Sequence, residues 1–322
     1  MADAHRRPRR ISQDRILSLL MITPTLIAIA IFVYGFIGWT GYMSMSAWEG
    51  IRPDYTFVGF DNYISIFNTG RFQTNLRNTI VFTSFFLVGC LGLGLALALL
   101  VDACRNRISE AVFRTIYLFP MALSLIVTGV AWRWIFTPGT IPTDPTGINL
   151  LFQHIGLGFL QSPWITDSTV VPGIRPEGLR TRLGIPFAMI PIIVAAVWQM
   201  SGFTMAMYLA GLRGIPHEIR EAARVDGANE WQLFRLVILP QLRPITLSAV
   251  IILGHISLKI FDLVVTMTGG GPGNATEVPG VYMYEIAFKA NKFAEGAAVA
   301  MVMLVLVALL IIPYLVYNQP ED

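Results

Sequence analysis

The stretch Asn78-Thr-Ile-Val-Phe-Thr-Ser-Phe-Phe-Leu-Val-Gly-Cys-Leu-Gly-Leu-Gly-Leu-Ala-Leu-Ala-Leu-Leu-Val101 decides the fold class of this chain. It contains no charged side chain, and it is long enough for the roughly 20 helical residues that cross the hydrocarbon core of a bilayer. The run is continuous and lacks the alternation of barrel strands, so a helix is predicted.

The whole chain has the composition of a membrane protein. Hydrophobic residues make up 54% of its 322 positions and charged residues 13%, whereas soluble domains carry about 25% charge. We therefore predict an all-α integral membrane protein with six transmembrane helices over residues 16–318, between a tail at 1–15 and a tail at 319–322. The predicted spans are 16–40, 78–101, 114–136, 185–212, 244–265 and 296–317.

Lysine and arginine positions predict the orientation of these spans. If the N-terminus is cytoplasmic, more than half of the 23 basic residues lie inside: Arg6, Arg7, Arg9, Arg10, Arg15, Arg105, Arg107, Arg114, Arg213, Arg220, Arg224, Arg235 and Arg243. The apolar run after Arg15 is too long for a signal peptide, so we expect a retained helix. Both termini are predicted to be cytoplasmic. The outer loop 137–184 is then long enough to pack as a small cap or rest on a partner.

One predicted cytoplasmic segment, 214–240, behaves unlike a loop. Pro216 suits the first turn of a helix, and Gly227 permits a sharp turn at a backbone angle that other residues avoid. A second helix is predicted to start at Asn229, with Gln232 completing a capping box, and to end at the proline of position 240. Two short helices at a glycine elbow would form a compact knob.

The residues of this segment leave two interpretations open. Small residues such as Ala222 and Ala223 allow close approach to a groove in another protein. An interfacial helix on anionic lipid is the alternative, which Arg220, Arg224 and Arg235 would support.

The motif Glu221-Ala-Ala-Arg-Val-Asp-Gly-Ala228, followed by Phe234 and Ile238-Leu-Pro240, resembles the EAA motif of ABC importer permeases. In that family the segment inserts into a cleft of the ATPase subunit. The resemblance implies that the ATPase-coupling residues are Glu221, Ala222, Ala223, Asp226, Gly227 and Ala228.

Other segments are similar to sugar permeases of the maltose-transporter MalF type. They are Val58–Tyr63, Ala131–Phe136 and Phe261–Gly273, the last of which continues to Thr276. Within that group, Trp198–Phe203 and His255–Asp262 look most like the glucose/mannose permeases. The long loop 137–184 departs from the shorter connection of much of the family.

This resemblance implies a MalF/MalG-type permease fold and a bacterial cytoplasmic (inner) membrane location. The implied function is import of a sugar, by preference glucose or mannose; maltose, trehalose or glycerol phosphate remain alternatives. The implied partners are a second permease subunit, two ATPase subunits that hold ATP and Mg, an extracytoplasmic solute-binding protein and membrane lipid. The chain itself is expected to bind no cofactor or metal and to have no catalytic residue.

Polar residues within the spans are candidates for the substrate path, because ionisable groups at membrane depth are costly. The spacing of His255, Lys259 and Asp262 predicts one stripe of a single helix, with mutual neutralisation of Lys259 and Asp262 as the alternative role. On the fourth span, Trp198, Gln199 and Ser201 would supply an aromatic face and hydrogen bonds for a sugar.

Other function classes fit the sequence less well. A secondary transporter should show an inverted repeat with broken helices, and a membrane enzyme should show a metal cluster, a nucleophile triad or paired buried carboxylates; neither pattern is evident. The glycines at 269–273 lack the Gly-Lys-Ser/Thr ending of a phosphate loop. The net charge of +3 is too small to indicate a nucleic-acid partner.

Overall fold

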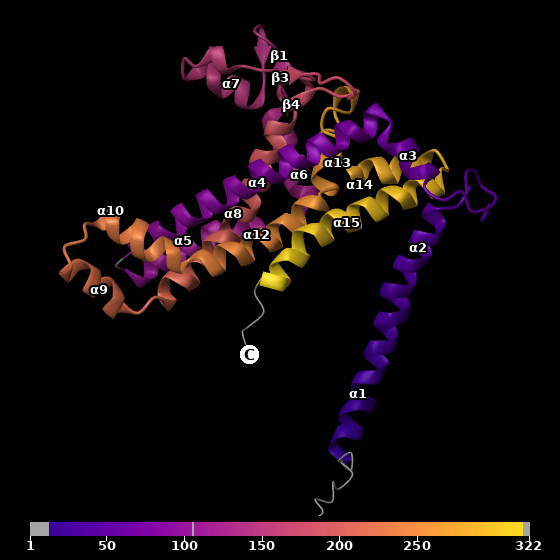
Figure 1. Ribbon diagram of the computed structural model, residues 1–322. Helices are drawn as coiled ribbons and strands as arrows, with labels where there is room; N and C mark the ends of the chain where they lie inside the picture. The colour runs from indigo at the N-terminus through magenta and orange to yellow at the C-terminus, as the bar shows by residue number, and fades with distance from the viewer. Residues whose placement is uncertain (1–12, 105, 318–322) are drawn as a thin grey trace, which may run out of the picture.

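The computed structural model describes residues 13–104 and 106–317 (Figure 1). Most of the predicted N-terminal tail, the whole predicted C-terminal tail and Arg105 lie outside these ranges. Four helical stretches within them are long and apolar enough to cross a membrane, or up to six if two bent pairs each count as one span. The four are α1–η1–α2 (Gln13–Ile29, Ala30–Gly35 and Phe36–Ser44), α4 (Gly70–Asp102), α8 (Met189–Gly214) and α15 (Phe293–Tyr317). The number of spans and the side of each terminus remain predictions.

The predicted single span 114–136 is broken in the structure. α5 (Arg107–Leu118) continues into the 3-10 turn η2 (Phe119–Ala122), and α6 (Leu125–Phe136) then leaves at 98°. Pro120 has no backbone N–H to continue an α-helix, and the Ser124 hydroxyl caps the new helix by accepting a hydrogen bond from the Val127 N–H. The segment predicted as one helix is therefore two helices, and the prediction that it makes one membrane span stays a prediction.

The predicted span 244–265 is also interrupted. α12 (Arg243–Leu258) ends at Leu258, and α13 (Asp262–Met267) starts after three non-helical residues. Ile260 is 7% exposed and packs into the main core. No proline or glycine marks this break, so tertiary packing is its visible physical cause.

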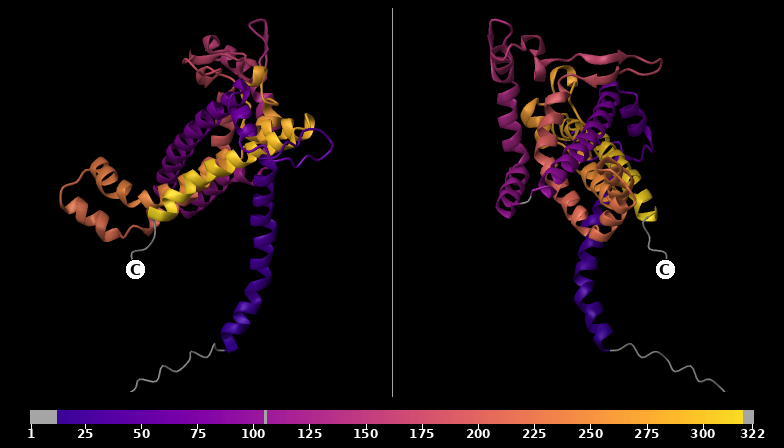
Figure 2. Two further views of the ribbon diagram at one scale, coloured as in Figure 1. Left: turned by 45° about the vertical axis from the view of Figure 1, so that its right-hand side comes forward. Right: turned by 90° about the vertical axis from the view of Figure 1, so that its left-hand side faces the viewer.

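The connections at 45–69, 137–188 and 268–292 fold into short elements, most of which form a cap above one end of the long helices (Figures 1 and 2). They are α3 (Asp61–Phe67), β1 (Gly139–Thr140), β2 (Asp144–Pro145), α7 (Gly147–His154), η3 (Gly158–Leu160), η4 (Trp164–Thr166), β3 (Val170–Ile174), β4 (Leu183–Pro186), η6 (Pro272–Asn274), α14 (Pro279–Tyr284) and η7 (Glu285–Lys289). β1 pairs antiparallel with β2, and β3 with β4. The fold is therefore helical with two small hairpins rather than strictly all-α.

Buried Asn149 organises the cap. Its Oδ1 accepts a hydrogen bond from the Trp164 indole at 2.7 Å, and its Nδ2 donates to the Ser162 carbonyl at 2.9 Å. The loop 137–184 thus has its own internal order, as a cap requires.

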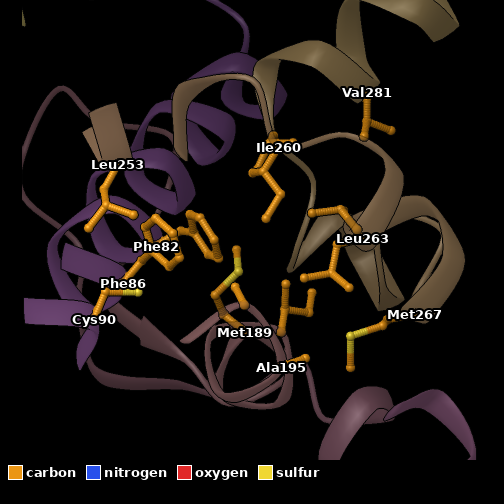
Figure 3. Packing of buried hydrophobic residues seen from close by; sticks show 14 of the residues in the cluster. Phe82, Phe86, Cys90, Met189, Ala195, Leu253, Ile260, Leu263, Met267 and Val281 are labelled. Carbon is orange, nitrogen blue, oxygen red and sulfur yellow. The ribbon is translucent and has the colours of Figure 1, made fainter. Parts of the chain in front are cut away.

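The hydrophobic core lies between α4, α8, α12 and α13. Figure 3 shows Phe82, Phe86 and Cys90 of α4 facing Met189 and Ala195 of α8 and Leu263 of α13. Glycine lets helices approach closely in such bundles. At Gly202, for example, an added Cβ would overlap the backbone carbonyl oxygen of Tyr117 in α5.

Helix α1 stands apart from the rest of the molecule (Figures 1 and 2). All its described side chains from Leu17 onward, and those of η1, are exposed. Packing begins only in α2, which contacts α15. An apolar helix with this exposure is suited to lipid or to another membrane chain.

Candidate functional site

The segment 214–240 forms a lobe that projects beyond the ends of α8 and α12 (Figures 1 and 2). It contains α9 (His217–Val225), α10 (Glu230–Gln232) and the π-helical stretch η5 (Leu233–Ile238). Two short helices at an elbow were predicted here, and the structure has this arrangement.

Gly227 closes α9 in a left-handed conformation, with φ of +85°. Its N–H donates to the Arg224 carbonyl at 3.1 Å, and the Ala228 N–H donates to the Ala223 carbonyl at 3.0 Å. This pair of bonds is a Schellman motif, in which glycine avoids the Cβ penalty. The predicted turn at Gly227 is thereby explained.

Asn229 starts the second helix with a reciprocal capping box. Its Oδ1 accepts from the Gln232 N–H at 2.9 Å, and the Gln232 side chain accepts from the Asn229 N–H at 2.9 Å. The two bonds satisfy N–H groups that a helix start otherwise leaves free. The predicted capping box is present.

The second helix does not end at Pro240 as predicted. It continues through α11 (Leu239–Gln241), and a 60° bend separates it from α12. Pro240 cannot donate to the Leu236 carbonyl, and the preceding stretch widens into a π-helix, in which Leu239 N–H donates to the Phe234 carbonyl. Proline therefore deforms this helix rather than ending it.

The lobe is fixed to the long helices by a buried contact and by an arginine. Leu233 and Ile238 lie in one core cluster with Met205 and Leu212 of α8. Arg220 donates to the Leu212 carbonyl at 2.6 Å and lies 3.6 Å from the carboxylate of Asp102 at the end of α4. The sequence analysis did not identify Arg220 as an anchor. The contact reaches back eight residues to Leu212, two positions before the end of α8 at Gly214, and no local sequence pattern predicts it.

The motif residues divide between an outer and an inner face of the lobe. Glu221, Ala222, Asp226 and Gly227 are exposed, whereas Ala223 and Ala228 are half-buried. The outer face also presents two apolar side chains, Val225 at 87% and Trp231 at 66% exposure. Exposed apolar side chains on a projecting face, an aromatic one among them, are features of a protein-binding surface.

Gln199 lies at the kink between α5 and α6. Its side chain is buried, and its Nε2 donates at 2.8 Å to the Leu123 carbonyl, which the helix break leaves free. Gln199 Oε1 has no hydrogen-bond partner within the described residues. Beside it, Trp198 contacts Trp132 edge to face at 5.6 Å, and buried Ser201 donates to the Trp198 carbonyl.

His255, Lys259 and Asp262 do not form the predicted stripe of a single helix. His255 belongs to α12 and Asp262 to α13, with the break between them. Lys259 and Asp262 are exposed, and no ion pair joins them within the described ranges. The simple neutralising pair considered from the sequence is therefore not formed.

An ionic cluster that the sequence analysis missed joins the start of α4 to the connection between α13 and α15. Arg71 at the start of α4 binds both Glu277 and Glu285. Glu277 is 1% exposed, and the hydrogen bond from Arg71 lowers the pKa of Glu285. These residues are some 200 positions apart in sequence, so no local pattern predicts the contact.

Comparison with known proteins identifies similar chains. Residues 90–319 match the model of the family described as binding-protein-dependent transport system inner membrane component. A probable ABC transporter permease of Pyrococcus horikoshii is 41% identical over 97% of this chain and 99% of its own. A xylose/arabinose import permease of Haloferax volcanii is 34% identical over 92% of this chain and 86% of its own.

A solved structure has a similar fold. It is a bacterial ABC transporter involved in the import of the acidic polysaccharide alginate, with a TM-score of 0.74 at 20% identity over 95% of this chain and 98% of that one.

Proposed function

Since the chain belongs to the family of inner-membrane components of binding-protein-dependent transport systems, we propose that it is the permease subunit of an ABC importer for a sugar. It is a multi-pass membrane protein with several apolar helices. Relatives named as xylose/arabinose and glucose import permeases support the sugar class. Glucose or mannose is our preferred substrate, and a disaccharide or glycerol phosphate is the alternative.

The observation that carries this proposal is the projecting lobe 214–240. Its outer face offers Glu221, Ala222, Asp226 and Gly227 to an ATPase subunit, while Ala223 and Ala228 support that face from within. The small side chains let a partner surface approach the backbone of the turn, and the two carboxylates meet basic groups at its rim.

Force applied to the lobe would reach the membrane helices. Leu233 and Ile238 are buried together with residues of α4 and α8, and Arg220 links the lobe to the ends of both helices. ATP and Mg would be bound by two separate ATPase subunits. A second permease subunit would complete the pore.

The cap formed by the loop 137–184 lies away from the lobe (Figures 1 and 2), and we assign it to the side where a solute-binding protein delivers the sugar. The proposed path residues lie between the cap and the lobe; they are Trp198, Gln199, Ser201, His255, Lys259 and Asp262. The break between α12 and α13 exposes Lys259, and Gln199 Oε1 is free to accept a hydrogen bond from a sugar hydroxyl if the kink opens.

The test is transport by the reconstituted importer with its ATPases and binding protein. Glu221→Lys should lower ATP-driven uptake at least tenfold, equivalent to about 1.4 kcal/mol or more of interface energy. Glu218→Lys is the matched control, because Glu218 is exposed on the same helix but lies outside the motif. Uptake that is unchanged in Glu221→Lys and persists without ATP would instead identify a secondary transporter. Binding of a sugar panel to the solute-binding protein tests the substrate separately.

A further inference from the structure

An open groove of about 470 Å³ lies at the bend between the lobe and α12. Its lining residues are Arg235, Leu239, Pro240, Arg243, Thr246 and Leu247. The volume is within the range of about 300–1,000 Å³ that is usual for small-molecule sites.

The groove contains two arginines that have no ion pair within the described part of the chain. Between residues 213 and 243, Arg213 pairs with Glu110, Arg220 with Asp102 and Arg224 with Glu230. The two remaining arginines of that stretch, Arg235 and Arg243, are exposed and both line the groove. A planar guanidinium binds phosphate through two parallel hydrogen bonds.

The other walls of the groove are apolar. Leu239 and Leu247 are 39% and 41% exposed, and Pro240 lines the groove beside Leu239. The Thr246 hydroxyl already donates to the Leu242 carbonyl and lies 3.0 Å from the Tyr208 hydroxyl. A ligand that fits must therefore be anionic at one end and apolar along the rest.

The position of the groove points to the occupant. α12 begins at Arg243 and forms, with the preceding helix Glu230–Gln241, a bent pair that counts as one candidate membrane span. The two exposed arginines at this bend favour its placement where hydrocarbon gives way to headgroups. Basic side chains at that level attract anionic lipids. We propose that the groove binds an anionic phospholipid, with its phosphate between Arg235 and Arg243 and an acyl chain along Leu239 and Leu247.

Such a lipid would connect the two sides of the bend. Arg235 belongs to the lobe and Arg243 to the membrane helix. The surface charge of the leaflet on the lobe side therefore influences how firmly the lobe is held, independently of which substrate is transported.

The purified full chain tests this by native mass spectrometry in mixed micelles that contain equal amounts of phosphatidylglycerol and phosphatidylcholine. An arginine in direct contact with an anionic headgroup favours its retention by a factor of about five, and the groove holds two such arginines, Arg235 and Arg243. The wild type should therefore retain phosphatidylglycerol roughly 25-fold over phosphatidylcholine, and the double variant Arg235→Gln/Arg243→Gln should lose this preference. Arg107→Gln/Arg114→Gln is the charge-matched control, because both arginines are exposed on α5, and it should keep the preference.

Two further measurements distinguish lipid binding from binding of other ligands. Leu247→Gln should weaken phosphatidylglycerol retention, whereas millimolar inorganic phosphate should not displace the lipid. Equal retention of both lipids by the wild type, or complete displacement by phosphate, would overturn the proposal. It would also be overturned if Arg235→Gln/Arg243→Gln kept the lipid preference but failed to co-purify with a partner subunit, since the groove would then be a protein contact.

Discussion

Replacement of Gly227 by alanine isolates the conformational requirement of the turn in the lobe. At φ of +85°, a residue with a Cβ costs about 1–2 kcal/mol. An added Cβ would meet no atom within 4 Å, so no clash contributes to this figure. Gly214→Ala is the matched control: its Cβ also meets nothing within 4 Å, but Gly214 ends α8 without a positive φ.

The measurement is amide hydrogen exchange of peptides from α9 and α10 in the purified chain. A loss of about 1–2 kcal/mol in local stability corresponds to roughly 5- to 30-fold faster exchange. The Ala228 N–H, which donates to Ala223, should show the largest change, and Gly214→Ala should leave this region unaffected. Gly227→Ala with wild-type exchange throughout the lobe would refute the argument that the left-handed turn holds α9 against α10.

Two further changes test the packing and the outer ionic cluster. Gly202→Ala should lower the thermal unfolding midpoint by the equivalent of about 1–3 kcal/mol, because its Cβ would overlap the Tyr117 carbonyl. Gly92→Ala is the control, since its Cβ meets nothing within 4 Å. Equal midpoints for the two variants would contradict the close approach of α8 and α5. Arg71 lowers the pKa of Glu285 below its ordinary value of 4.5, so this carboxylate stabilises the folded state above that pH, and the contribution is lost as the pH falls. In Glu285→Gln the thermal unfolding midpoint should therefore fall less steeply from pH 7 to pH 3 than in the wild type. Equal slopes in the two proteins would show that Glu285 plays no part in the response to acid.

Local chemistry made the lobe predictable. Gly227, Asn229 and Gln232 act through neighbours within five positions, and such short-range bonds are visible in a sequence. The break in 114–136 was also visible, because Pro120 and the capping Ser124 lie together in the middle of the apolar run. The length of the apolar run is enough for one span, but length alone does not exclude such a break.

Other features depend on contacts that no local pattern contains. The break after Leu258 follows from the packing of Ile260 into the core, and the role of Gln199 depends on a carbonyl that only the kink frees. The i, i+4 rule placed His255, Lys259 and Asp262 on one stripe, but it presupposes an unbroken helix. The ionic cluster of Arg71 likewise requires the ends of α4 and of the outer connection to meet in space.

The cluster shared by Leu233, Ile238, Met205 and Leu212 has a mechanical consequence. Close-packed interiors are nearly incompressible, so a push on the lobe is not absorbed by local yielding between it and α8. The lobe and the adjoining halves of α4 and α8 should move as one rigid body about a hinge that lies farther along the helices. The kinks at Leu123 and Lys259 lie beyond that rigid part, and they are the places where the backbone has the freedom to bend.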